Sequence, residues 1–176
     1  FINGALGGMV TPASSEHTFE ECERIGVAVA NTAIAAVGSA APVADGGLQH
    51  DRRVFTSPME NAQFRAAVDA GIVPVGPATD TVVTEVSLIR LGDVALATIP
   101  GEMLPSLGFE LRDTIRQRLG CESPFILGLA NDELGYILSE EEFDLELYEY
   151  EASMSVGRGI GPATLDALYE MMPSHD

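Results

Sequence analysis

The stretch Val94-Ala-Leu-Ala-Thr-Ile-Pro-Gly-Glu102 organises the chain. Its apolar residues predict a buried strand that stops at Pro100-Gly101 and hands Glu102 to the start of a well-patterned helix. Open α/β sheets bind their ligands beyond the carboxyl ends of the strands, so an acid at this point is a candidate for chemistry. The helix dipole alone also explains an acid here, since it stabilises such a charge by about 0.3–1 kcal/mol.

A second stretch has the same form. Phe125-Ile-Leu-Gly-Leu-Ala130 is apolar throughout, which is typical of a strand buried on both faces, and it leads into Asn131-Asp-Glu-Leu-Gly-Tyr136. Ordinary turn chemistry explains Asn-Asp, and a rim position explains the tyrosine. In the alternative interpretation these groups face the same cleft as Glu102, where a dication would lower the tyrosine pKa from its free value near 10.

Length and charge exclude several classes of protein. The 176 residues are 46% hydrophobic, enough for one domain with a core, and no apolar run approaches the length of a membrane span. The net charge of −18 argues against nucleic acid as a partner, because phosphate contacts require clustered cations. A neutral or cationic substrate or a metal ion fits this charge, although solubility alone also explains it. Cys22 and Cys121 lack CxxC spacing; we expect two buried free thiols, with a single disulfide as the alternative.

Helical and strand patterns predict the rest of the architecture. We expect a strand at 1–6, a helix over 18–37 packed closely against a sheet through its alanines, and a second helix that begins at Ser57-Pro-Met-Glu60. The segments 81–90 and 93–99 predict an antiparallel hairpin, and a helix follows over about 103–119. Strands that alternate with helices, together with one hairpin, predict an α/β fold: a layered mixed sheet flanked by helices.

Other residues that carry chemistry give weaker signals. The glycine-rich start has no GxGxxG frame and no lysine, so a tight turn that presents Asn3 is favoured over a phosphate loop. Neither GxSxG nor HExxH is present. The three histidines are not spaced as a metal cluster, and only His50, expected in a loop, stays a candidate. Residue types alone therefore predict an α/β domain with an acidic or metal-binding cleft.

Four short motifs in order resemble one family. They are Ile99-Pro-Gly-Glu102 before a helix, Gly128-Leu-Ala-Asn131, Gly135-Tyr136 and Tyr148-Glu149. They look like the neutral (non-lysosomal) ceramidases, and 1–12 is similar to the family's glycine-rich segment that carries its nucleophilic serine. The resemblance covers most of the chain. It implies that 1–176 is either a single domain or the C-terminal part of a larger catalytic domain, with the upstream part of that domain as its partner.

The resemblance implies a zinc-dependent amidase that splits the amide of an N-acyl sphingoid base. The family holds zinc with two histidines, a glutamate and a tyrosine; Glu102 and Tyr136 match the last two, and the histidines belong to an earlier segment. Asn3, Asn131 and Asp132 are the residues we expect to act in or orient the catalytic site. A secreted or periplasmic location follows if the chain resembles the family in this respect too.

One departure from the family's pattern leaves alternatives open. Gly4-Ala5 stands where the family has its serine, and Gly8 stands where it has the acid that follows. Our leading hypothesis is a ceramidase-like metal-dependent hydrolase of an amide in a small molecule or lipid, in which metal-bound water replaces the serine. The alternatives are a non-catalytic binding or structural relative, and a carboxylate-dependent α/β hydrolase without a metal.

Overall fold

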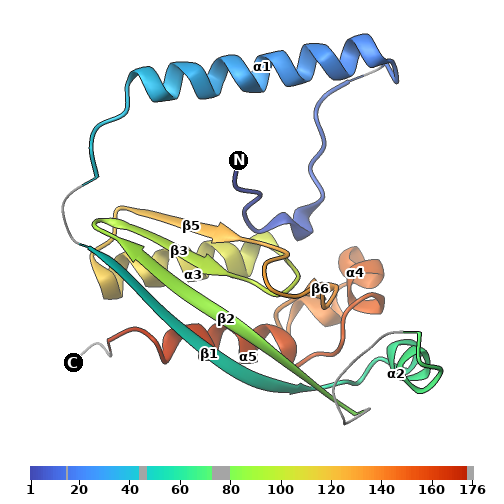
Figure 1. Ribbon diagram of the computed structural model, residues 1–176. Helices are drawn as coiled ribbons and strands as arrows, with labels where there is room; N and C mark the ends of the chain where they lie inside the picture. Colours follow the sequence, from blue (N-terminus) through green and yellow to red (C-terminus); the bar gives the residue numbers. More distant parts are fainter. Residues whose placement is uncertain (15, 44–46, 73–79, 174–176) are drawn as a thin grey trace.

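A mixed four-stranded sheet forms the centre of the protein. The computed structural model describes residues 1–14, 16–43, 47–72 and 80–173. The sheet has the order β1–β2–β3–β5 (Figure 1) and consists of β1 (Leu48–Pro58), β2 (Thr81–Leu91), β3 (Val94–Thr98) and β5 (Ser123–Leu127). β2 pairs antiparallel with both β1 and β3, whereas β5 pairs parallel with β3. The predicted α/β fold, with a mixed sheet and an antiparallel hairpin, is confirmed.

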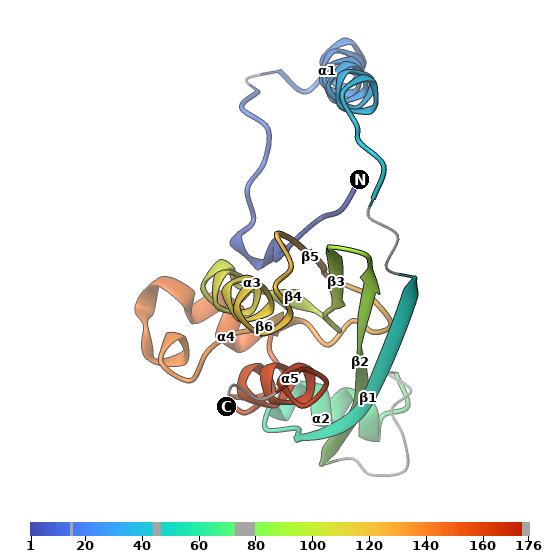
Figure 2. The same cartoon turned by 90° about the vertical axis from the view of Figure 1, so that its left-hand side faces the viewer.

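Two helices cover one face of this sheet. They are α3 (Pro105–Leu119) and α5 (Ile160–Tyr169), which lie side by side against it in Figure 2. α3 packs on β5, and α5 packs on β1 and β2. Leu107, Leu111 and Ile115, all on the predicted apolar face of α3, are buried. They form one core with Leu88 of β2 and Ile126 of β5, so the periodicity of this helix was interpreted correctly.

The remaining described elements are one long helix, α1, and several short ones. They are η1 (Leu6–Gly8), α1 (Phe19–Gly38), α2 (Ala62–Asp69), β4 (Glu102–Met103), β6 (Tyr136–Ile137), η2 (Glu142–Asp144), η3 (Glu146–Tyr148) and α4 (Glu149–Ser153). The Ser139 hydroxyl accepts from the Glu142 N–H at 3.2 Å, and the Glu142 carboxylate accepts from the Ser139 N–H at 2.9 Å. This reciprocal cap fixes the turn that enters η2.

The expected packing of the first helix was wrong. α1 begins one residue later than predicted, with the Thr18 hydroxyl accepting from the Glu21 N–H at 3.2 Å. None of its residues is buried, and it stands apart from the sheet in both ribbon views. Alanine has the highest intrinsic helix propensity, so an alanine-rich helix forms without a packing partner. Cys22 on α1 is accordingly exposed, not buried as expected, while Cys121 is buried; both thiols are free.

Three further predictions of local structure need correction. Ser57 does not cap a helix: it pairs with Val82 in the long β1–β2 ladder, and Asn61 caps α2 instead. The segment 1–6 is not a strand, because only Gly4, at φ +73°, bridges Leu127. β5 is not buried on both faces: its burial alternates, and Phe125 is 41% exposed. The alternation follows because the helices cover only one face.

The sequence between α2 and β2 is rich in proline and glycine over 72–79, and 73–79 lie outside the described residues. Among the described helices, none combines the length and the apolar composition needed to cross a membrane.

Candidate functional site

The two stretches singled out from the sequence run side by side beyond the ends of β3 and β5. The backbone N–H of Ile99 donates to the Leu127 carbonyl at 2.9 Å, and the N–H of Leu134 donates to the Pro100 carbonyl at 2.9 Å. β4 and β6 then pair in parallel, and this register places Glu102 opposite Tyr136. The structure therefore brings together the carboxylate and the phenol that the sequence placed on separate strand ends.

Glu102 does not lie at a helix terminus, contrary to expectation. It occupies β4, and α3 begins at Pro105 with Leu104 as the cap. Its backbone N–H donates to the Gly135 carbonyl at 2.9 Å, so the main chain of the acid is fixed by the neighbouring strand. Stabilisation by the helix dipole falls off within the first turn and is a poor explanation for a residue held in a strand before the cap.

Two glycines allow β4 and β6 to approach this closely. A Cβ atom at Gly101 would collide with the Gly135 carbonyl oxygen. A Cβ at Gly135 would in turn collide with the Met154 carbonyl oxygen, and Gly135 has φ +75°, where side chains are strained. The Tyr136 N–H donates to the same Met154 carbonyl at 3.1 Å. Residues without side chains therefore set the position of the Glu102–Tyr136 pair.

A cavity of about 310 Å³ lies against this pair. Its walls are mostly apolar and include Met59, Phe64 and Leu134. The lining residues that carry polar groups are Glu102, Glu133, Tyr136 and Tyr150. Its volume falls at the lower end of the range of small-molecule sites, about 300–1,000 Å³. Tyr150 closes one side, its ring edge-on to Tyr136 with centroids 6.0 Å apart. Apolar walls with a few convergent polar groups are typical of a ligand site.

The surroundings of the pair shift the pKa of its tyrosine. Burial raises the pKa of the Tyr136 hydroxyl to about 12, and hydrogen bonding to Glu102 together with its charge contributes to this rise. Tyr136 is only 6% exposed. At neutral pH the phenol is therefore protonated beside the Glu102 side chain. A dication at this point would reverse the shift, because it favours the phenolate.

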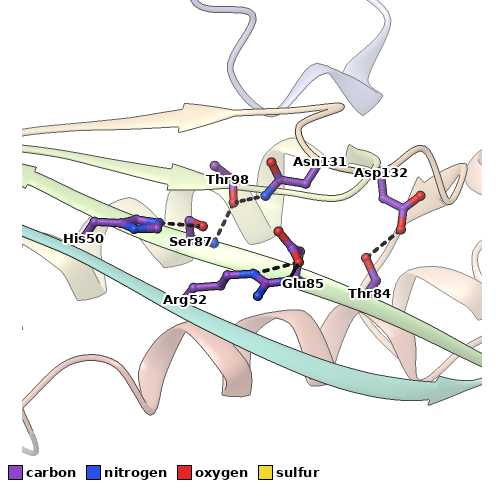
Figure 3. Close-up of polar contacts among 8 residues, drawn as sticks. All are labelled: His50, Arg52, Thr84, Glu85, Ser87, Thr98, Asn131 and Asp132. Carbon is purple, nitrogen blue, oxygen red and sulfur yellow. Dashed lines mark hydrogen bonds and ion pairs between the residues drawn. The ribbon is translucent and has the colours of Figure 1, made fainter.

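Asn131 and Asp132 are held by threonines of the central sheet (Figure 3). The Asn131 amide donates to the Thr98 hydroxyl at 3.4 Å, and that hydroxyl also accepts from the Ser87 N–H at 2.7 Å. The Thr84 hydroxyl donates to the Asp132 carboxylate at 3.1 Å. Neither residue is among the described residues that line the cavity at Glu102, although their neighbour Glu133 is.

Asn3 binds the backbone of β5's extension rather than the cavity. Its amide donates to the Gly128 carbonyl at 2.8 Å, and its side-chain oxygen accepts from the Gly128 N–H at 3.0 Å. The Asn3 side chain thus makes the two hydrogen bonds that the backbone of a paired strand would make, and it attaches the N-terminal segment to the sheet. Further along that segment, a Cβ at Gly7 would come within 2.6 Å of the Glu102 carbonyl oxygen, so the glycine-rich turn packs directly on β4.

His50 lies on β1, not in a loop. Its Nε2 is 3.1 Å from the Ser87 hydroxyl, beside the Arg52–Glu85 ion pair (Figure 3). Within the described part of the chain, no three His, Cys, Asp or Glu side chains are arranged to hold a metal. Sequence reasoning missed Tyr150 and Met154 as wall residues, because the sequence beyond Leu147 fits neither a helical nor a strand periodicity clearly.

Fold and site together define a layered α/β domain with a carboxylate–tyrosine pair beyond its parallel strand ends. No family model matches the chain. It is 36% identical over 104 residues, 57% of its length, to neutral ceramidase A of Dictyostelium discoideum. It is 31% identical over 102 residues, 56% of its length, to neutral ceramidase B of the same organism. These matches confirm the resemblance to neutral ceramidases over about half of the chain.

A solved structure extends the likeness of fold. The neutral ceramidase from Pseudomonas aeruginosa superposes with a TM-score of 0.63 over 94% of this chain and 36% of its own, at 19% identity. The matched segments span only 14% and 13% of the two curated relatives. The chain is thus related to ceramidases, and it corresponds to a minor part of their length.

Proposed function

We propose that this chain is the C-terminal part of the catalytic domain of a ceramidase-like, zinc-dependent amidohydrolase. Its substrate would be an N-acyl lipid or a related small amide. The names of the curated relatives support the reaction class. The observation that carries the proposal is the parallel register that sets Glu102 opposite Tyr136 on the wall of a mostly apolar cavity.

The donor set here fits part of a zinc site. A carboxylate and a phenol oxygen on neighbouring strands supply two oxygen ligands, and a three-ligand catalytic site with an open position needs at least one more. Since the described residues contain no group of three His, Cys, Asp or Glu side chains arranged to hold a metal, we assign the remaining ligands to the histidines that the resemblance places in an earlier segment. Zinc, when bound, supplies a Lewis acid and a bound water of lowered pKa.

The chain's own groups have definable tasks in amide hydrolysis. Before a metal binds, Tyr136 holds its proton at neutral pH, because burial beside Glu102 raises its pKa to about 12. A bound dication would favour the phenolate instead. The apolar walls formed by Met59, Phe64 and Leu134 exclude water and accommodate a hydrocarbon segment. Asn131 and Asp132 would orient the loop that carries Glu133 and Tyr136, through their bonds to Thr98 and Thr84.

The N-terminal segment favours a second candidate, a non-catalytic relative. Gly4-Ala5 supplies no nucleophile where the family has its serine, and both ends of the Asn3 amide are occupied by Gly128. Such a protein would keep the cavity and bind an N-acyl lipid without cleaving it.

Release of fatty acid from an N-acyl sphingoid base by the full-length protein tests the proposal. We expect hydrolysis that stops on chelation, returns with zinc, and falls at least ~100-fold in Glu102→Gln and Tyr136→Phe, since loss of a ligand exceeds the 10–100-fold typical of outer groups. His50→Gln, on β1, is the matched control and keeps its activity. Binding without release of fatty acid in the wild-type protein would support the non-catalytic alternative, and activity that survives chelation would contradict the zinc assignment.

A further inference from the structure

A second cavity, of about 150 Å³, lies between the N-terminal segment and α3. It is lined by Gly4 and Ala5 from that segment, Phe109 and Arg112 from α3, and Ile126 from β5. Within the described residues it shares no wall with the cavity at Glu102 and Tyr136. The N-terminal segment seats tightly beside it, because a Cβ at Gly108 would come within 2.5 Å of the Ala5 Cβ.

Arg112 is the only charged residue among the described walls of this cavity. Its Nε is buried and has no hydrogen-bond partner among the described residues, and no described carboxylate forms an ion pair with its guanidinium. One turn further along α3, Arg116 pairs with Asp113 at 2.8 Å. Arg118 stacks over the Tyr169 ring. Arg112 thus differs from both of its neighbours on the helix.

Scarcity of acids does not explain the unpaired guanidinium. The chain has 27 acidic and nine basic residues, so carboxylates outnumber cations threefold. Buried donors are nearly always satisfied, so the buried Nε–H of Arg112, a side chain that is otherwise partly exposed, needs an explanation. A ligand that enters the cavity and accepts from Arg112 supplies one.

The cavity restricts the chemistry of that ligand. A guanidinium presents a planar fork that matches a carboxylate with two parallel hydrogen bonds. A single cation in a strongly acidic chain favours a monoanion over a polyanion. Phe109 and Ile126 make part of the cavity wall apolar. A volume near 150 Å³ accommodates a ligand about the size of a benzene molecule. We propose that the Arg112 cavity binds a small free monocarboxylate with a short apolar tail, of the size of butyrate.

Nitrogen-detected NMR of arginine side chains tests this site in the full-length protein. On titration with butyrate we expect the Arg112 Nε–H resonance to shift and exchange more slowly. Arg112→Gln should weaken butyrate binding at least ~10-fold, because a hydrogen bond to a charged group contributes enough free energy for a change in affinity of that size. The control variant Arg116→Gln should bind butyrate as the wild-type protein does. Circular dichroism checks that each variant folds. If Arg112→Gln does not fold, the titration of the wild-type protein alone tests the proposal.

Three outcomes would overturn the proposal. The first is an Arg112 resonance that butyrate leaves unchanged. The second is an equal response to inorganic phosphate, which would make the site a general anion site. The third is an Nε–H already bonded to a carboxylate of the protein itself, which butyrate does not displace. The inference is independent of amide hydrolysis, since each readout is binding at Arg112 and none measures turnover.

Discussion

Glu102 and Tyr136 stand opposite one another in the parallel register of β4 and β6, thirty-four positions apart in the chain. The pairing is made by backbone groups: Glu102 N–H donates to the Gly135 carbonyl, and Tyr136 N–H donates to the Met154 carbonyl. Because the main chain fixes both residues, the two side chains are presented together to the cavity without help from a flexible loop.

The pH dependence of stability should report the environment of Tyr136. An unfolded tyrosine ionises near pH 10, whereas the folded protein holds this proton up to a pKa of about 12. Between these values the folded state binds a proton that the unfolded state has lost, so stability falls as pH rises. The loss is on the order of 2–3 kcal/mol, because each tenfold difference in proton affinity between the two states corresponds to about 1.4 kcal/mol.

Urea unfolding between pH 9 and 12 measures this effect, with Tyr136→Phe as the test variant. The fall in stability should become shallower in Tyr136→Phe. Burial also raises the pKa of Tyr169 to about 12, so Tyr169 contributes to the fall in stability with pH in the same direction. Tyr169→Phe removes that contribution and is the control. A Tyr136→Phe protein with the wild-type slope would show that Tyr136 is not perturbed.

Gly135→Ala should destabilise the protein by about 2–4 kcal/mol, because the new Cβ meets the Met154 carbonyl at a strained positive φ. Gly26→Ala is the matched control: it lies within α1 with nothing near its Cβ and should stabilise by about 0.5–1 kcal/mol. Thermal unfolding of both variants compares the two sites. Equal, small effects would argue against the close approach of β6 to Met154.

Asn3→Ala should lower the free energy of unfolding by about 1–2 kcal/mol, because it leaves the Gly128 N–H and carbonyl without their partners. Ser14→Ala, in which the lost hydroxyl bonds the exposed carbonyl and N–H of Glu16, should be neutral. Denaturant titration measures both variants. If Asn3→Ala keeps full stability and loses only turnover, Asn3 acts in catalysis and not in positioning the N-terminal segment.

The sequence predicted the fold class and the meeting of Glu102 with Tyr136, because strand ends and glycines leave local signals. It failed where tertiary pairing overrides a local motif. Ser57-Pro-Met-Glu60 has the residues of a helix start, yet Ser57 is buried in the β1–β2 ladder. The alanine-rich composition also led us to expect that α1 packs on a sheet, although alanine forms helices without a packing partner.

The unpaired state of Arg112 had no signal in the sequence. Three arginines lie in the C-terminal half of α3, and of these only Arg116 and Arg118 lie in the last turn, where the helix dipole favours cations. Arg112 differs from Arg116 in the structure because Arg116 pairs with Asp113, whereas Arg112 lines a cavity with Gly4 and Ala5. The sequence also did not predict Tyr150 and Met154 as cavity residues. They line the cavity through tertiary contacts of a segment that has no clear periodicity.

Zinc content of the purified full-length protein tests the central claim most directly. We predict about one zinc ion per chain in the wild-type protein and in Glu133→Ala, whose acid lines the same cavity but is not a proposed ligand. Glu102→Ala and the nearly isosteric Glu102→Gln should both lose the metal while circular dichroism shows an intact fold. Unchanged zinc stoichiometry in the two folded Glu102 variants would contradict the assignment of Glu102 as a ligand.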